Sequence, residues 1–506
     1  MDRAIDQGSN EFHLSEIEAQ APALISSGDD RLDYVLGGGF AKNCTILIEG
    51  DPGAGKTTLA LTFALEGVRK GGSCLYICLS ESEEDLKAVA DSHGLSLEGL
   101  HIADLSPGSE ALNENTTTMF HPSDVELSEL TTAITNAFEQ HSPTRVVIDS
   151  LGELRHLSQS ELRYRRQLIA LKSYFRSKEC TVLFIDDRKE IADLQLQSVA
   201  RGTIELQKST PNYGRIRRRL QVSKMRGQRV RTGFHEFTIE RGGLQIYPRL
   251  VAAEHQRTFE PGMLTSGIAE LDSLLSGGLR YGTSTLITGA AGTGKSSLTA
   301  QYAHAAIQQG GAAAIYAFDE TAGNYITRSE GLGIPIGADR ESGKLVLKQV
   351  DSAELSPAEF AWHARRAVEE LNCRVVVIDS LNGYLHAMPD EHYLRGQLHE
   401  LLSYFSQLGV CTLITLSQHG LIGTDVESPV ETSYLADANI LLRYFEHSGR
   451  VRKAISVVKK RAGGHEASIR ELALSSNGIR ISEPLDDFQG VLAGVPEYLG
   501  THDPLI

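Results

Sequence analysis

Long apolar runs are what this 506-residue sequence lacks most clearly. No uninterrupted stretch is long enough to cross a bilayer, which argues against a membrane-spanning protein. The N-terminal stretch MDRAIDQGSNEFHLSEIEAQ also lacks the apolar core of a signal peptide, so we expect a cytoplasmic protein with no membrane association. With 41% hydrophobic and 23% charged residues, the composition is that of a soluble globular chain of two or three domains.

Paired cysteines and a surplus of positive charge are also missing. The six cysteines are scattered, mostly inside apolar runs, with no CxxC pair and no zinc spacing, so we interpret them as buried free thiols. The net charge is −16, whereas a protein that coats nucleic acid needs a basic track. The acidic balance therefore argues against nucleic acid as the main partner, without excluding a local basic groove.

An internal repeat organises what is present. Gly50–Thr57 reads GDPGAGKT and Gly289–Ser296 reads GAAGTGKS. Each loop follows an apolar, β-prone run and precedes a helix-compatible segment, the context of a phosphate-binding loop. Further motifs upstream and downstream of the two loops recur in the same order, so a chance match by a glycine-rich turn is disfavoured. We predict that the chain binds nucleotide twice.

The glycines of such a loop let backbone N–H groups cradle phosphate oxygens at a helix N-terminus, where the helix dipole favours negative charge. Lys56 and Lys295 are predicted to lie against the β- and γ-phosphates. The predicted phosphate-binding residues are the two loops and the hydroxyl residue after each: Gly50, Asp51, Pro52, Gly53, Ala54, Gly55, Lys56, Thr57, Thr58, Gly289, Ala290, Ala291, Gly292, Thr293, Gly294, Lys295, Ser296 and Ser297.

A magnesium ion is the expected companion of these loops, with Thr57 and Ser296 supplying a hydroxyl to it. Asp149 and Asp379 each end a continuous apolar run of the buried parallel-strand kind. An aspartate at the carboxyl end of such a strand lies in the crevice where ligands bind. We predict that both carboxylates hold Mg²⁺ through water.

Acidic residues follow the strand that lies between each loop and its metal aspartate: Glu81 in the first copy, Asp319 and Glu320 in the second. A carboxylate there can orient or deprotonate the attacking oxygen in phosphoryl transfer. The alternative is that these acids cap the next helix, which the neighbouring Ser82 and Thr321 also fit. We favour catalysis at Glu81 and Glu320 and keep both interpretations at Asp319.

A basic segment recurs near the end of each copy, with Lys224 and Arg226 in the first and Lys459 and Arg461 in the second. These residues are too far along the chain to belong to their own loop. They are either solvated surface charges or charges that contact the nucleotide of a neighbouring subunit. Their repetition in both copies favours the second interpretation. Arg215–Arg219 has no clear partner in the second copy, and we interpret it as an exposed basic strand edge.

Strands alternate with helices in both copies, which predicts the α/β class with mainly parallel sheets flanked by helices. We expect a flexible lead-in over residues 1–24, a first domain over 25–247, a linker over 248–260, a second domain over 261–482 and a tail over 483–506. One helical stripe is predicted to pack in the core rather than bind a cofactor: Leu394, Leu398, Leu401, Leu402 and Phe405.

The order of these motifs resembles the KaiC family. The first copy contains, in this order, the motifs SG-x-x-x-LD-x-x-LGGG, GDPGAGKT, SES, VVIDS and KMRG. The second copy adds FDET, ETSYLADANILL and KKRAGGHEASIREL. The resemblance covers about residues 26–482. It implies two tandem RecA-like P-loop NTPase domains in a homohexameric double ring, with ATP and Mg²⁺ between subunits. It further implies ATP hydrolysis in the first domain, serine/threonine autophosphorylation in the second, and protein signalling partners of the KaiB or histidine-kinase type.

Some positions depart from the family pattern. Ser80 stands in place of the leading acid beside Glu81, whereas the second copy keeps the pair. His465 matches the family's histidine after the basic motif and joins the predicted trans-acting residues, but Val230 takes that position in the first copy.

The family's phosphorylation pair is also altered. Aligned on Asp437, the sequence offers Ser433 as a phosphoacceptor, with Thr432 one residue earlier, and Tyr434 replaces the second acceptor. An ordered two-site cycle is therefore not inherited. The departures favour a KaiC-like homologue outside the clock proper, acting as a signalling ATPase.

Two other functions are compatible with the same RecA-like domains. A RecA-like DNA repair recombinase or helicase would need DNA-contacting basic loops, and the acidic balance and fused double domain argue against it. A nucleotide-gated, non-catalytic scaffold would use ATP only to hold the ring together. Turnover that is lost in Glu81→Gln or Glu320→Gln variants would contradict the scaffold.

Overall fold

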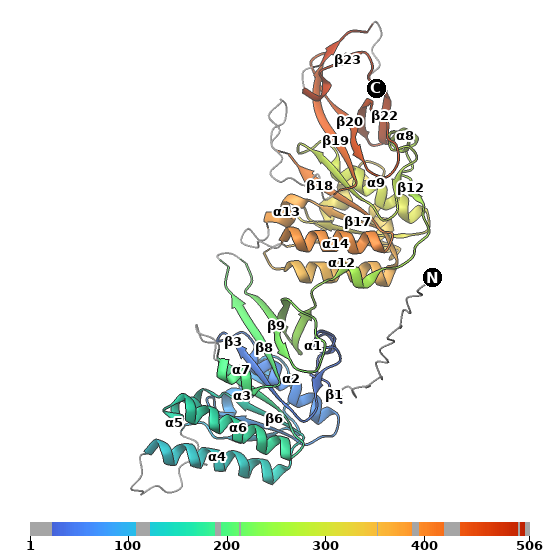
Figure 1. The fold of residues 1–506 in the computed structure, drawn as a ribbon. Helices are drawn as coiled ribbons and strands as arrows, with labels where there is room; N and C mark the ends of the chain where they lie inside the picture. Colours follow the sequence, from blue (N-terminus) through green and yellow to red (C-terminus); the bar gives the residue numbers. More distant parts are fainter. Residues whose placement is uncertain are drawn as a thin grey trace, which may run out of the picture. The chain divides into compact units, whose positions relative to one another are not determined.

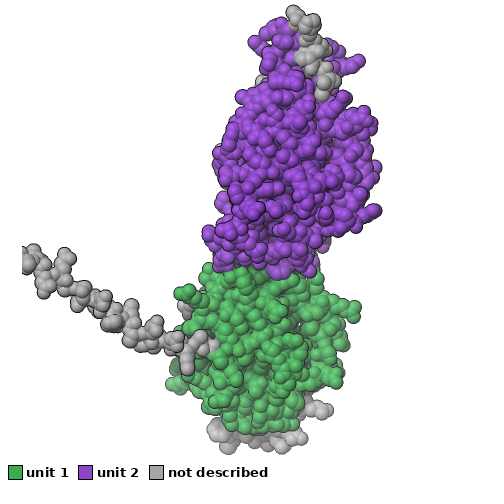
Figure 2. Space-filling model, turned by 90° about the vertical axis from the view of Figure 1, so that its right-hand side faces the viewer, with its two compact units in different colours: residues 1–208, 218–248 green, residues 209–217, 249–506 purple. Residues whose placement is uncertain are grey.

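The computed structural model describes residues 23–107, 122–187, 194–211, 214–351, 353–386, 394–418, 436–493 and 496–500. The chain forms two compact units, shown in different colours in Figure 2. Unit 1 comprises residues 1–208 and 218–248, and unit 2 comprises residues 209–217 and 249–506. The finer boundaries at 24/25, 247/248, 260/261 and 482/483 stay a prediction.

Unit 1 is built on a nine-stranded sheet of order β11-β10-β9-β8-β3-β7-β6-β4-β5. Of these strands, β3, β6, β8 and β9 are labelled in Figure 1. From β8 to β5 the neighbouring strands are parallel, and β10 is antiparallel to both β9 and β11. The strands are β3 (Thr45–Gly50), β4 (Cys74–Cys78), β5 (His101–Asp104), β6 (Arg145–Asp149), β7 (Thr181–Asp187), β8 (Gly202–Ser209), β9 (Arg217–Met225), β10 (His235–Glu240) and β11 (Gly243–Tyr247).

Helices cover both faces of this sheet, because alternate residues of a strand point to opposite sides. Ile46 and Ile48 pack in one apolar cluster with α1 (Asp30–Leu36), α2 (Lys56–Arg69) and α3 (Glu83–Ser92). Leu47, between them, packs in the cluster of the opposite face. That face is covered by α4 (Pro122–His141), α5 (Gly152–Ser158), α6 (Glu161–Ser177) and α7 (Leu194–Val199).

Unit 2 repeats the plan with a sheet of order β16-β15-β17-β18-β14-β19-β20-β21-β22. Its first six strands in that order are parallel, and β20, β21 and β22 form the antiparallel end. The strands are β14 (Ser284–Gly289), β15 (Ala312–Ala317), β16 (Leu345–Gln349), β17 (Cys373–Asp379), β18 (Cys411–Ser417), β19 (Ala438–His447), β20 (Arg450–Lys460), β21 (Ile469–Ser475) and β22 (Gly478–Pro484).

The second sheet also lies between two helical layers. One apolar cluster includes residues of α8 (Ala269–Leu274), α9 (Lys295–Gln308), α10 (Ala322–Glu330) and α11 (Ile336–Glu341). The other includes residues of α12 (Pro357–Leu371), α13 (Leu381–His386) and α14 (Leu394–Gln407). The predicted stripe of α14 is buried in this second cluster, so its interpretation as core is confirmed.

The predicted fold class is confirmed, since both units are mainly parallel sheets between helices, as in tandem RecA-like domains. Five of the six cysteines are buried and Cys44 is half-buried, all as free thiols, which confirms that prediction too. Within the described part of the chain, no helix combines the length and apolarity that a membrane span requires.

Short elements complete the two units. Two-stranded ribbons pair β1 (Leu24–Ile25) with β2 (Phe40–Ala41) and β12 (Met263–Leu264) with β13 (Leu279–Arg280). A third ribbon pairs β23 (Phe488–Gln489) with β24 (Glu497–Tyr498), and Phe488 packs in a small apolar cluster with Phe445. Short 3₁₀ helices span Ala252–His255 and Val491–Ala493.

Candidate nucleotide sites

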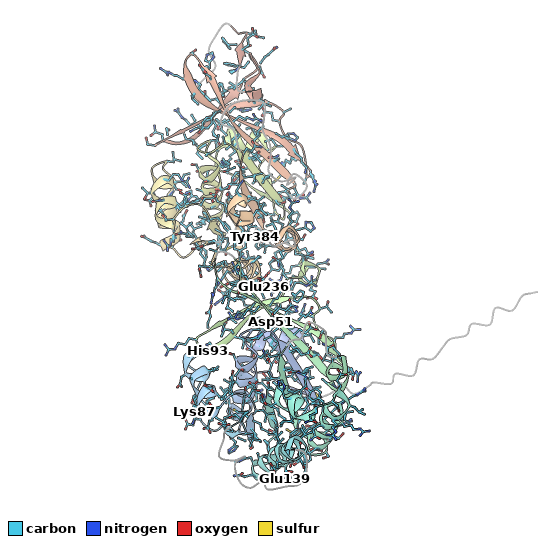
Figure 3. The ribbon with its side chains drawn as sticks, turned by 90° about the vertical axis from the view of Figure 1, so that its left-hand side faces the viewer. Asp51, Lys87, His93, Glu139, Glu236 and Tyr384 are labelled. Carbon is cyan, nitrogen blue, oxygen red and sulfur yellow. The ribbon has the colours of Figure 1, made fainter. Side chains whose placement is uncertain are left out.

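The first phosphate loop joins the central strand of its sheet to a helix, as the sequence predicts. Gly50 ends β3, Gly55 adopts a φ of 107°, and α2 begins at Lys56. The carboxylate of Asp51, which is labelled in Figure 3, accepts a hydrogen bond of 2.9 Å from the backbone N–H of Lys208 on β8. Lys56 Nζ donates to the carbonyl oxygens of Gly50 and Asp51 at 3.0 and 3.1 Å. The backbone of the loop therefore holds the lysine beside the predicted phosphate position.

The second loop has the same geometry. Gly294 adopts a φ of 108° and α9 begins at Lys295. Lys295 Nζ donates to the carbonyl oxygens of Gly289 and Ala290 at 2.9 and 2.8 Å. Burial lowers the pKa of Lys295, and the carboxylates of Asp379 and Asp319 act in the opposite direction. The remaining predicted loop residues lie in these two turns and in the first turn of each helix.

The predicted magnesium residues of the first site lie together. Thr57 Oγ1 donates to Asp149 Oδ2 at 3.0 Å, and the buried Tyr76 hydroxyl donates to the same oxygen at 2.6 Å. Burial raises the pKa of Asp149, although these two hydrogen bonds oppose the effect. A carboxylate and a hydroxyl at the start of the loop helix are the oxygen ligands that Mg²⁺ prefers.

In the second site, Asp379 is buried at the end of β17. Its Oδ1 accepts a hydrogen bond of 2.5 Å from Thr415 Oγ1 on β18, and its Oδ2 is buried without a hydrogen-bond partner. Burial raises the pKa of Asp379, and the nearby hydroxyl groups of Thr415 and Ser296 oppose the effect. A buried carboxylate oxygen without a donor is destabilising unless a cation or donor reaches it. The residues present therefore fit a magnesium ion, which would neutralise phosphate charge.

The acids after β4 and β15 do not serve as the helix caps. The Ser82 side chain caps α3 in a reciprocal capping box with Asp85, and the Thr321 side chain caps α10. Glu81 is exposed between β4 and this cap. Partial burial, followed by the carboxylates of Asp149 and Asp85, raises the pKa of Glu81. The capping alternative therefore does not hold for these acids, and their catalytic role stays a prediction.

The second site differs around its acids. Ser380 Oγ donates to Asp319 Oδ2, and Glu320 Oε1 lies 2.5 Å from Arg328 Nη2 on α10. In the first site the equivalent position to Asp319 is Ser80, whose hydroxyl lies 2.8 Å from the hydroxyl of Ser150. A hydroxyl pair thus replaces a hydroxyl–carboxylate pair.

The predicted trans-acting residues lie on β9 and β20 and in the turns after them. Lys224 Nζ donates to the carbonyl oxygen of Ala200 at 2.8 Å, and Lys459 Nζ to that of Ala436 at 3.0 Å. Burial lowers the pKa of both lysines.

The arginines of these segments differ from the lysines in their setting. Arg226 is exposed, and Arg461 Nη1 lies 3.7 Å from Asp437 Oδ1. His465 is half-buried. Ser433 and Thr432, the predicted phosphoacceptors, lie outside the described residues.

Besides Ser380, several residues that the sequence analysis did not single out contact these sites. Asp187 forms an ion pair with Lys56, and Arg328 pairs with Glu320, while Tyr76 and Thr415 donate hydrogen bonds to the two predicted metal aspartates. Asp187 could have been found, because it ends an apolar strand as Asp149 does. A single hydroxyl residue inside an apolar strand marks Tyr76 and Thr415 more weakly. Nothing in the local sequence marks Arg328.

Comparison with known proteins agrees with this geometry. A family model for the KaiC ATPase matches residues 25–251 and again residues 264–486. The chain therefore belongs to the KaiC family of ATPases.

Individual relatives match along nearly the whole chain. The "Circadian clock protein KaiC3" of Synechocystis is 26% identical over 490 residues, covering 94% of this chain and 94% of the relative. The "Circadian clock oscillator protein KaiC" of Acaryochloris marina is 24% identical over 477 residues, covering 92% and 89%. The protein of the same name from Thermostichus vulcanus is 25% identical over 492 residues, covering 94% and 91%.

Proposed function

We propose that this protein is a signalling ATPase that assembles as a homohexameric ring, hydrolyses ATP at the first site and phosphorylates its own serine or threonine at the second. It acts in signalling or timing through protein partners of the KaiB or histidine-kinase type, in the cytoplasm. The observation that carries the proposal is the pair of equivalent sites, each with a loop lysine, a helix-start hydroxyl and a buried strand-end aspartate.

At each site the chain's own residues have separable tasks. The loop N–H groups and Lys56 or Lys295 bind the phosphates, and Thr57 with Asp149, or Ser296 with Asp379, would hold Mg²⁺. The ion, when bound, supplies charge that stabilises the transferring phosphoryl group. Glu81 orients the attacking water and accepts its proton, since its raised pKa makes it a stronger proton acceptor than an ordinary glutamate.

The second site is proposed to transfer phosphate between subunits. Asp437, four residues after Ser433, accepts a hydrogen bond of 3.0 Å from the backbone N–H of Ser284, at the start of β14. The phosphate loop leaves the opposite end of β14, at Gly289, which is about 16 Å away at the usual rise of a strand. Asp437 therefore lies at the end of β14 remote from its own phosphate loop, and we propose that a neighbour's nucleotide donates phosphate to Ser433 or Thr432.

The trans-acting role of the basic segments also remains a proposal. Exposed Arg226 fits a charge that reaches a neighbouring subunit, and Lys224 shapes the turn that presents it through its contacts with backbone carbonyls. Arg461, Lys459 and His465 are proposed to act equivalently in the second ring.

One sample tests the main parts of this proposal. The purified chain is incubated with ATP and Mg²⁺, and native mass spectrometry, released phosphate and phosphopeptides are measured together. We expect a six-subunit species, steady phosphate release that Glu81→Gln reduces at least tenfold, and phosphate on Ser433 or Thr432. A chain that stays monomeric contradicts the ring. Unmodified Ser433 and Thr432 after prolonged incubation contradict autophosphorylation.

A further inference from the structure

The lysine of the first phosphate loop already has an anionic partner in the protein itself. Lys56 Nζ lies 2.8 Å from Asp187 Oδ1. The Lys56 side chain is 10% exposed, whereas that of Asp187 is 64% exposed. Asp187 is the last residue of β7 and pairs in register with Gly50, the first residue of the loop. The strand register thus places a carboxylate beside the group that would bind phosphate.

The second loop has no carboxylate at this position. Ser417 pairs in register with Gly289, as Asp187 pairs with Gly50. The contacts described for Lys295 Nζ are with the carbonyl oxygens of Gly289 and Ala290. Since the two loops otherwise share their geometry, the difference reduces to one side chain at one register position.

The first site also concentrates negative charge around Lys56. The carboxylates of Asp149 and Asp187 both raise the pKa of Glu81, and the positive charge of Lys56 opposes them. A nucleotide adds further negative charge at the same place. In the second site, Glu320 is paired with Arg328, and the carboxylates that act on Lys295 are those of Asp379 and Asp319.

We propose that Asp187 is a displaceable counter-ion of Lys56 that lowers the affinity of the first site for nucleotide. A phosphate oxygen must replace the carboxylate on Lys56, and the released carboxylate then stays close to a group of the same sign. Both effects oppose binding, and the solvation of Asp187 keeps them moderate. The inference rests on the proposed binding of nucleotide at the two loops.

The test measures binding of a fluorescent ATP analogue with Mg²⁺ to the full chain carrying Lys295→Ala, so that the first site is observed alone. Asp187→Asn keeps the shape of the side chain and removes its charge. We expect this substitution to lower Kd by about two- to five-fold, as for a solvent-exposed ion pair. The difference should shrink at high salt, because exposed charges are screened. Misfolding weakens binding, so a gain in affinity is not a sign of damage.

Glu83→Gln in the same background is the matched control. It removes a carboxylate two residues from Glu81 that pairs with Lys87 at 2.6 Å rather than with Lys56. We expect no change in Kd.

The reciprocal experiment transfers the counter-ion to the second site. In the chain carrying Lys56→Ala, Ser417→Asp should raise Kd for the second site by about two- to five-fold, and the uncharged Ser417→Asn should not.

The outcomes separate the inference from the function it rests on. Unchanged or weaker binding in Asp187→Asn, when the parent chain binds the analogue, overturns the role of Asp187 and leaves the nucleotide site standing. A parent chain that binds no analogue overturns the proposed role of the loop itself.

Discussion

At the scale of residues, the two sites hold equivalent aspartates with different hydroxyl groups. Asp149 is held by Tyr76 on β4, and Asp379 is held by Thr415 on β18. The strands β4 and β18 flank the aspartate strand from opposite sides of their sheets. The same local need, a donor for a buried carboxylate, is therefore met from unrelated positions.

The buried charge of Asp149 lowers stability in a pH-dependent way. Because burial raises its pKa above the ordinary value, the folded chain binds the proton more tightly than the unfolded chain does. The free energy of unfolding therefore falls as pH rises through the unfolded pKa toward the folded one. We expect Asp149→Asn to raise the thermal midpoint of the ligand-free protein at neutral pH, because the buried charge is removed. The gain should vanish below about pH 4, because the aspartate of the parent protein is then protonated and uncharged, like the asparagine of the variant.

Calorimetry of the ligand-free protein at the two pH values measures this difference. Asp85→Asn is a control of opposite sign, since hydrogen bonds with Ser82 hold the pKa of Asp85 below its usual range. Its ionised form contributes stability above the unfolded pKa, which is lost as pH falls through the folded pKa, so this variant should melt lower at neutral pH. An Asp149→Asn protein that also melts lower at neutral pH would contradict the argument.

Arg328 is expected to restrain hydrolysis at the second site. It pairs with Glu320, stacks on the Tyr325 ring at 4.6 Å and donates to Ser297 Oγ at 3.3 Å. Val89 takes the equivalent place in the first copy, at the same spacing as the two loops. Arg328→Val should free the Glu320 carboxylate to act on water and raise kcat by about two- to five-fold, the range of a partly exposed ion pair, with KM unchanged.

Phosphate release by the full chain carrying Lys56→Ala measures turnover at the second site alone. Arg328→Lys keeps the charge and should stay close to the parent rate, which a purely structural role of the arginine would not predict. A lower kcat in Arg328→Val would show that the guanidinium assists the reaction instead of restraining it.

At the scale of elements, the loop glycines connect the phosphate loops to the antiparallel ends of the sheets. A Cβ on Gly55 would lie 2.7 Å from Ile239 Cδ1 on β10, and one on Gly294 would lie 2.9 Å from Leu474 Cδ1 on β21. Both glycines have a left-handed φ, which costs other residues about 1–2 kcal/mol. Each loop is therefore held by backbone conformation and by close packing together.

Gly55→Ala should destabilise the first unit and weaken nucleotide binding, because either the loop or β10 must shift. Gly71→Ala is the control, since Gly71 also has a positive φ (78°) but no heavy atom within 4 Å of its Cβ position. Denaturant unfolding should show a loss of about 1–2 kcal/mol for Gly71→Ala and a larger loss for Gly55→Ala. Equal losses would mean that Ile239 yields without cost.

At the scale of the whole molecule, the proposed ring makes each first site the product of two subunits. Lys56 belongs to the subunit that binds the nucleotide, and Arg226 to the neighbour that assists it. We expect Lys56→Ala and Arg226→Ala proteins to lose most first-site hydrolysis separately, by at least tenfold. Mixed rings should recover part of it, because some interfaces then combine an intact Lys56 with an intact Arg226.

Phosphate release from subunits mixed before ring assembly, both carrying Lys295→Ala to silence the second site, measures the recovery. Each variant alone, at the same total concentration, is the control. Rates in the mixture that equal the average of the two separate variants would place Arg226 outside the neighbouring site.

The fold class, the two loops and the strand-end aspartates could be predicted from the sequence. These features are local: a strand, a glycine-rich turn and a helix start follow one another within a few residues, so their spacing records their geometry. The repeat also pointed to the acids Glu81, Asp319 and Glu320, because acidic residues follow the equivalent strand in both copies.

Which side chains contact these residues could be learned only from the folded structure. Asp187 reaches Lys56 because β7 lies beside β3, although more than a hundred residues separate them in the chain. Arg328 reaches Glu320 through the packing of α10, and Tyr76 and Thr415 reach their aspartates across neighbouring strands. Sheet order in a parallel fold does not follow chain order, so no local pattern records the contacts of Asp187, Tyr76 and Thr415.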